Sequence, residues 1–199
     1  IDIALGATVV IPDMNLTKPA TAKPANLLKA LTDHKATVAF MSPILVKKTI
    51  GIAHQTQTSL PHLRDLLTGV APVPLLLHSA LREVAPNANL RVNYGATEGL
   101  TLCGTDSDAV LSDGVRGTAA GMGTLVGSPM PGVQVAVLPI TDEKVDAVDL
   151  DTPRNVIGEL AVSGSVVSPE YKDNPAANAA SKIMTQGVLW HRTGDLGRI

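Results

Sequence analysis

The first forty residues alternate between short apolar runs and a helical stripe. Residues 7–11 (ATVVI) and 37–41 (TVAFM) are rich in β-branched and apolar side chains, and a proline-containing turn closes each run. Both runs therefore predict buried strands. Between them, residues 25–34 place leucines at positions 27, 28 and 31, which is the spacing of a helix that lies on a sheet. Together these segments predict one β-α-β unit.

The same alternation recurs further along the chain. Residues 63–70 predict another strand, residues 74–84 predict a helix with one apolar stripe, and residues 90–94 predict a strand. Strands separated by helices are typical of a mostly parallel sheet covered by helices on its faces. The first half of the chain therefore predicts an α/β fold with flanking helices.

The pattern changes after about residue 108, where glycines become frequent and polar and apolar residues alternate. Residues 133–137 and 157–164 alternate cleanly, as half-buried antiparallel strands do. The alanine-rich residues 174–184 predict a helix, and the acidic residues 141–155 predict an exposed connection. This half predicts a small antiparallel β subdomain, a distorted barrel. We therefore expect an α/β subdomain over residues 1–110 and a β-rich subdomain over residues 111–199.

Composition narrows the range of partners. Charged residues make up 17% of the 199 residues and the net charge is −2, so no long-range attraction toward nucleic acid is expected. No apolar run approaches the roughly 20 residues that span a bilayer, so no membrane span is predicted. The single cysteine, Cys103, excludes an internal disulfide and a cysteine-based zinc cluster, and a cytoplasmic location is the expectation. Both chain ends are interpreted as cut from a longer protein.

The stretch NYGATEG at residues 93–99 places chemically different groups at the end of a predicted strand. The carboxyl ends of parallel strands are where such sheets bind ligands. The ring of Tyr94 can stack on a purine, Gly95 lets a backbone approach closely, Thr97 can donate to a phosphate and Glu98 can hold Mg²⁺. A nucleoside phosphate with its metal would use all four groups, whereas the structural alternative is a strand-end turn with a solvated glutamate.

A second polar stretch, HRTGDLG at residues 191–197, places Asp195 after a glycine. Its carboxylate can accept hydrogen bonds from both hydroxyls of a ribose. The alternative is an ordinary turn, because a Thr-Gly-Asp sequence alone is common in turns.

Other candidate sites are weaker. The glycines of residues 121–127 do not have the spacing of a dinucleotide-binding loop, and the histidines show no metal-ligand spacing. Ser79 lacks the flanking glycines of a nucleophile elbow. Cys103 is interpreted as a small buried apolar residue. His191 stays open, since it lies inside a motif.

Three motifs in order resemble those of the adenylate-forming superfamily of acyl-CoA synthetases, luciferases and peptide-synthetase adenylation domains. They are YGATE at 94–98, GELAVSG at 158–164 with SPEY at 168–171, and HRTGDLG at 191–197. The TGVAP sequence at 68–72 is similar to the turn that lines the adenine pocket in that family, although Val70 stands where a second glycine is common.

The resemblance implies roles for named residues. Tyr94 would stack on adenine, and Asp195 would hold the ribose. Thr97 would contact the α-phosphate, and Glu98 would bind Mg²⁺. The remaining residues that the resemblance places around the nucleotide are Val70, Ala71, Pro72, Asn93 and Gly95.

The resemblance also implies an activity for a larger protein. That protein would use ATP to convert a carboxylic acid, expected to be a fatty acid, into an acyl adenylate, and would then pass the acyl group to CoA. The family's phosphate-binding loop and its carboxy-terminal lysine domain are not recognisable here, so the chain alone is expected to be inactive. The sequences of residues 131–143 and 190–197 resemble most those of the β-lactone synthetases of olefin biosynthesis. Formation of a β-lactone from a β-hydroxy acid is therefore an alternative. A non-catalytic nucleotide-binding or scaffold protein is the other alternative.

Overall fold

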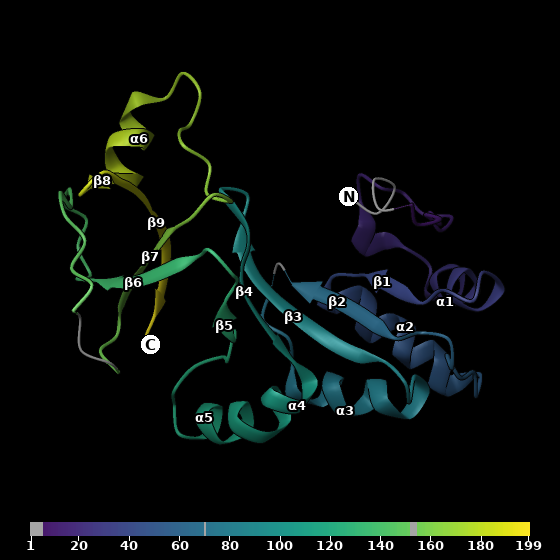
Figure 1. Ribbon diagram of the computed structural model, residues 1–199. Coiled ribbons are helices and arrows are strands. Elements are labelled where there is room, and N and C mark those ends of the chain that lie inside the picture. Colours follow the sequence, from purple (N-terminus) through teal and green to yellow (C-terminus); the bar gives the residue numbers. More distant parts are fainter. Residues whose placement is uncertain (1–5, 70, 152–154) are drawn as a thin grey trace. The chain divides into compact units, whose positions relative to one another are not determined.

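The computed structural model describes all residues except 1–5, 70 and 152–154 (Figure 1). The chain forms two compact units, each made of two segments. The first unit contains Ile1–Val92 and Thr105–Ala120, and the second contains Asn93–Gly104 and Gly121–Ile199. The predicted division at residue 110 stays a prediction.

In the first unit, helices pack on parallel strands as the periodicity predicts. The elements are α1 (Pro24–Asp33), β1 (Val38–Phe40), α2 (Pro43–Gln55), β2 (Asp65–Gly69) and α3 (Leu75–Val84), and β1 pairs with β2 in parallel (Figure 1). Prolines begin α1 and α2, where the missing N–H costs no helical hydrogen bond. One apolar core joins α1, α2, α3 and both strands, and it includes Leu28, Val46, Leu66 and Leu81. No element was predicted for residues 43–48, where α2 begins.

The larger sheet has the strand order β1-β2-β3-β4-β5 within the described residues. Its later strands are β3 (Asn89–Ala96), β4 (Gly99–Asp106) and β5 (Ser128–Pro129), and β4 pairs with β5 in antiparallel. The remaining helical elements are short: η2 (Pro19–Thr21), α4 (Ser107–Ala109), η3 (Val110–Gly114) and α5 (Val115–Ala119). The α/β class with a mostly parallel sheet is confirmed, with an antiparallel pair at the β5 edge.

The expected strand at residues 7–11 is wrong. These residues have no regular structure, and the side chains of Val9, Val10 and Ile11 are exposed. A β-branched run becomes a strand only when a neighbouring backbone accepts its hydrogen bonds. No strand in the described part of the chain pairs with this run.

The second unit holds an antiparallel sheet with the order β6-β7-β9-β8. Its strands are β6 (Gln134–Leu138), β7 (Gly158–Ser163), β8 (Lys182–Thr185) and β9 (Val188–Gly197), and the helix α6 (Pro175–Ser181) precedes β8 (Figure 1). Trp190 is buried against Ala136, Ala161 and Ile183. The predicted antiparallel sheet is confirmed, whereas the barrel form and the bounds of the subdomain stay predictions. The predicted helix at 174–184 is shorter than expected, because Lys182 already begins β8.

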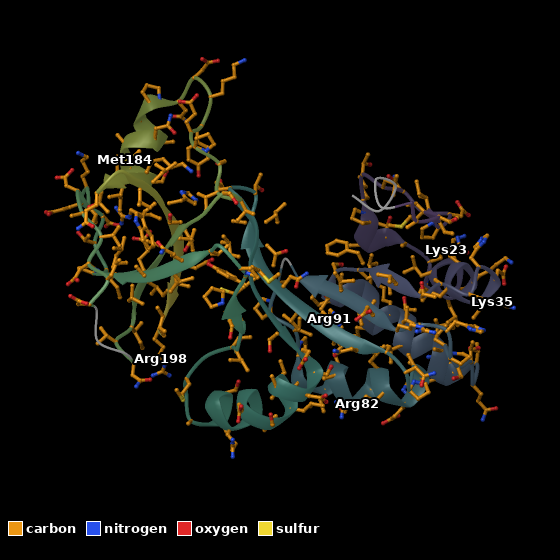
Figure 2. All side chains as sticks on the ribbon, in the orientation of Figure 1. Lys23, Lys35, Arg82, Arg91, Met184 and Arg198 are labelled. Atoms are coloured by element: carbon orange, nitrogen blue, oxygen red, sulfur yellow. The ribbon has the colours of Figure 1, made fainter. Side chains whose placement is uncertain are left out.

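Ion pairs and exposed side chains lie on the outer surfaces of each unit. Arg82 on α3 pairs with Asp108, and Arg91 on β3 donates from Nε to Asp65 Oδ1 at 2.5 Å (Figure 2). No helix in the part of the chain that the structure describes has the length and apolar character needed to cross a membrane.

Gly158, the first residue of β7, is expected to be required for packing against β6. A Cβ at this position would lie 2.1 Å from the carbonyl oxygen of Leu138. Gly158→Ala should therefore lower the free energy of unfolding of the full-length protein by about 1–3 kcal/mol, measured by urea denaturation. Gly51→Ala in α2 is the control, since no heavy atom lies within 4 Å of its added Cβ. That variant should be as stable as the wild type or slightly more stable, and equal stability of both variants would contradict the packing.

Candidate functional site

A bulge interrupts the pairing of β9 with β7. Glu159 faces Leu196 and Ala161 faces Arg192, so residues 193–195 stand opposite a single residue of β7. Gly194 has φ +77°, a conformation that glycine adopts without steric cost. The predicted glycine turn is therefore a β-bulge inside a strand, and Asp195 in this bulge is exposed to solvent.

A nearly buried ion pair fixes this bulge. Arg192 Nε donates to Glu159 Oε2 at 2.9 Å, and both side chains are only 11% exposed. The Gly194 N–H donates to Glu159 Oε1 at 3.2 Å. The Thr193 hydroxyl donates to a β7 carbonyl at 3.0 Å and accepts from the Asp195 N–H at 3.1 Å. Each residue of the bulge is thus held by at least one hydrogen bond to its surroundings.

Arg192 also anchors the start of the acidic connection. Its guanidinium donates to the carbonyl oxygens of Thr141 at 2.7 Å and Glu143 at 2.9 Å. The described part of residues 141–155 is largely exposed, as predicted, but its first residues are tied to β9 through this side chain.

Tyr94 and Asp195 contact each other although they lie 101 residues apart in the sequence. The Tyr94 hydroxyl donates to Asp195 Oδ2 at 2.7 Å. Burial, together with the neighbouring Asp195 carboxylate, raises the pKa of Tyr94 to about 12. The phenol therefore keeps its proton at neutral pH and remains a donor to Asp195.

Glu98 is held by a second tyrosine. The Tyr171 hydroxyl donates to Glu98 Oε1 at 2.8 Å across 73 residues of sequence. This hydrogen bond is the main reason why the pKa of Glu98 lies below its usual value. The half-buried carboxylate is therefore ionised at neutral pH.

A cavity of about 330 Å³ opens beside Glu98 and Tyr171. His191 lines it and is 3% exposed, and its Nδ1 has no hydrogen-bond partner among the described residues. Burial, together with the charge of Lys182, lowers the pKa of His191, so that its ring is neutral near pH 7. The rest of the lining comes from the bulge, the Arg192 and Glu159 pair, the end of α6 and the start of the acidic connection: Thr141, Asp142, Glu159, Ala180, Ser181, Arg192, Thr193 and Gly194.

The other residues predicted for the site have different surroundings. Asn93 and Gly95 lie in the last half of β3, and a Cβ on Gly95 would lie 2.8 Å from the Gly99 carbonyl oxygen. Packing within the hairpin therefore requires this glycine as well. Thr97 is exposed in the connection between β3 and β4.

The predicted adenine turn belongs to the first unit. Ala71 and Pro72 are exposed and follow β2, whereas Val70 lies outside the described residues. The prediction that this turn and Tyr94 border one cleft stays a prediction.

No role was predicted for Tyr171, Glu159 or Arg192. All three lie inside the motifs GELAVSG, SPEY and HRTGDLG, so membership of a motif was the sequence feature that could have identified them. No group of three or more His, Cys, Asp or Glu residues in the described ranges could hold a metal ion. Cys103 is buried and its burial raises the thiol pKa, which agrees with its interpretation as an apolar residue.

Comparison with known proteins identifies the family. The family model described as AMP-binding enzyme matches residues 3–172. The chain belongs to this family of AMP-binding enzymes. The resemblance inferred from the three motifs is therefore confirmed.

Relatives of the AMP-binding chain include several ligases. An olefin beta-lactone synthetase from Stenotrophomonas maltophilia is 33% identical over 98% of the chain. A 4-coumarate--CoA ligase from Solanum tuberosum is 28% identical over 88% of it. The chain spans 36% and 30% of the lengths of these two proteins.

A solved structure of the nonribosomal peptide synthetase FmoA3 shares the fold. The match has a TM-score of 0.81 at 23% identity, and it covers all of this chain and 20% of that chain.

Proposed function

We propose that the protein containing this AMP-binding chain is an ATP-dependent ligase that activates a carboxylic acid as an acyl adenylate. The observation that carries the proposal is the contact between Tyr94 and Asp195, which joins an aromatic ring and a carboxylate from two distant motifs. An aromatic ring can stack on the adenine of an adenosine, and a neighbouring carboxylate can accept hydrogen bonds from its two ribose hydroxyls.

Nucleoside binding is proposed to use both motifs. The Tyr94 ring would stack on adenine, with Asn93 and Gly95 beside it, and the Asp195 carboxylate would accept from the ribose hydroxyls. Since Asp195 already accepts from Tyr94, the phenol would keep the carboxylate oriented toward the sugar.

On the phosphate side we propose Thr97 and Glu98 as catalytic residues. Glu98 offers an ionised carboxylate, and no group of three or more His, Cys, Asp or Glu residues in the described ranges forms a cage of metal ligands. This donor set fits Mg²⁺, which commonly binds one or two carboxylates together with substrate phosphates. When bound, Mg²⁺ would neutralise part of the negative charge of the phosphates. Glu98 would hold that ion, and the exposed Thr97 hydroxyl would donate to the α-phosphate.

In the proposed reaction a carboxylate oxygen of the acid attacks the α-phosphorus of ATP. The bond from that phosphorus to the bridging oxygen breaks, and pyrophosphate leaves with its electron pair. Hydrogen bonds from Thr97 would stabilise the charge that develops on the phosphate oxygens. The proposal also includes a phosphate-binding loop and a carboxy-terminal lysine domain elsewhere in the protein, so this chain alone would be inactive. A cytoplasmic location is likewise proposed.

The acceptor of the acyl group has two candidates. The first is the thiol of CoA acting on a fatty acyl adenylate, which is supported by the similarity to a CoA ligase. The second is the hydroxyl of a β-hydroxy acid, which attacks its own activated carbonyl and expels AMP to close a β-lactone. The higher identity to the olefin beta-lactone synthetase favours the second.

Exchange of labelled pyrophosphate into ATP tests the proposal. The full-length protein should catalyse exchange with fatty acids, and 3-hydroxy fatty acids should separate the two branches. A product that has lost one water relative to the hydroxy acid, formed without CoA, supports the β-lactone branch, whereas a CoA thioester supports the other. Absence of exchange across a broad panel of acids would contradict adenylation and favour a non-catalytic nucleotide-binding protein.

A further inference from the structure

The segment at residues 167–171 lies across the connection between β3 and β4. Val167 forms an isolated antiparallel bridge with Gly99, and the Ser168 N–H donates to the Glu98 carbonyl at 2.7 Å. Val167 is also buried against Leu102. The backbone of Glu98 is therefore fixed by this segment before any side-chain contact is considered.

Tyr171 at the end of this segment is itself firmly held. Its N–H donates to Asn178 Oδ1 at 2.6 Å, and Asn178 Nδ2 donates back to the Tyr171 carbonyl at 2.9 Å. The ring meets His191 edge-on at a centroid distance of 6.2 Å. Lys182 Nζ lies 5.3 Å from the ring centroid and donates to the Ser168 carbonyl at 2.6 Å. The position of the phenol thus does not depend on Glu98.

We propose that Tyr171 is a positioning residue that orients the Glu98 carboxylate toward the nucleotide-bound divalent cation. The inference rests on the proposed function, in which Glu98 holds that cation. A flexible glutamate loses rotamer freedom when it binds a metal, and a fixed hydrogen bond lowers this cost in advance. A neutral phenol can hold the carboxylate by such a hydrogen bond and leave its negative charge available to the cation. A lysine or arginine in the same place would neutralise that charge.

Tyr171→Phe in the full-length protein tests this inference, because the variant removes the hydroxyl and keeps the ring beside His191 and Lys182. We expect the affinity for Mn²⁺ in the complex with the ATP analogue AMPPNP to fall by about tenfold, the lower end of the effect of losing an outer partner of a metal ligand. Electron paramagnetic resonance of free Mn²⁺ measures this affinity without catalysis. Pyrophosphate exchange should require correspondingly more Mg²⁺ and should recover at high Mg²⁺, while the KM of the acid stays unchanged.

The matched control is Glu170→Gln, which changes the charge of the exposed neighbouring residue and should leave Mn²⁺ affinity unchanged. If Tyr171→Phe does not fold, Asn178→Ala loosens the backbone of Tyr171 and should also weaken Mn²⁺ binding. Wild-type affinity for Mn²⁺ in a folded Tyr171→Phe complex would overturn the inference, even if pyrophosphate exchange supports the proposed function. Loss of exchange in the wild type across all acids would instead overturn the proposed function.

Discussion

Asp195→Ala in the full-length protein is expected to lower kcat/KM for ATP by about 100-fold or more, because two charge-assisted hydrogen bonds to the ribose hydroxyls disappear. The bulge that carries Asp195 is held by Glu159 and Thr193 through backbone groups, so the alanine variant should keep its local fold. Steady-state kinetics with varied ATP measures the effect.

Asp173→Asn is the control for Asp195→Asn. Both aspartates are exposed, and Asp173 lies in the turn before α6, outside the three motifs. The asparagine at position 195 should weaken ATP use strongly, whereas the one at position 173 should not. Unchanged ATP kinetics in a folded Asp195→Ala protein would remove Asp195 from the proposed nucleoside site.

Arg192→Ala is expected to lower the free energy of unfolding by about 3–5 kcal/mol, since it leaves Glu159 charged, buried and unpaired. Both side chains are 11% exposed, so water can replace the guanidinium only in part. The variant also loses the two contacts to the acidic connection. Urea denaturation of the full-length protein gives the change.

The exposed pair Arg116 and Asp113 provides the comparison. Their side chains are 79% and 70% exposed, and Arg116→Ala should cost at most about 1 kcal/mol. Equal losses in the two variants would show that burial does not set the value of the Arg192 pair. Because the pair also supports the bulge, we expect the KM for ATP to rise in Arg192→Ala and not in Arg116→Ala.

Local periodicity predicted most of the elements. The leucine spacing in α1 and the apolar stripe of α3 each reflect burial on one face, which a sequence displays directly. Residues 7–11 have an equally clear pattern, yet they form no strand, because pairing depends on a second backbone that local sequence does not specify. The family was also evident from motif order, and the comparison confirms it.

The motifs indicated candidate residues but did not indicate which of these residues contact one another. YGATE and HRTGDLG each display their polar groups within a few positions, whereas the hydrogen bond from Tyr171 to Glu98 joins residues 73 positions apart. The Thr-Gly-Asp stretch suggested a turn, and only the shifted pairing of β7 and β9 shows that it is a bulge. The roles assigned to the site residues and the domain boundary at residue 110 stay predictions.

Mass spectrometry of the product formed by the full-length protein with ATP, Mg²⁺ and a mixture of fatty and 3-hydroxy fatty acids tests acyl-adenylate formation most directly. We expect an acyl adenylate whose acyl mass matches one acid of the mixture, and the Asp195→Ala protein should form much less of it. A folded preparation that binds AMPPNP but yields neither an acyl adenylate nor a β-lactone with any acid would contradict the assignment as a carboxylate-activating ligase.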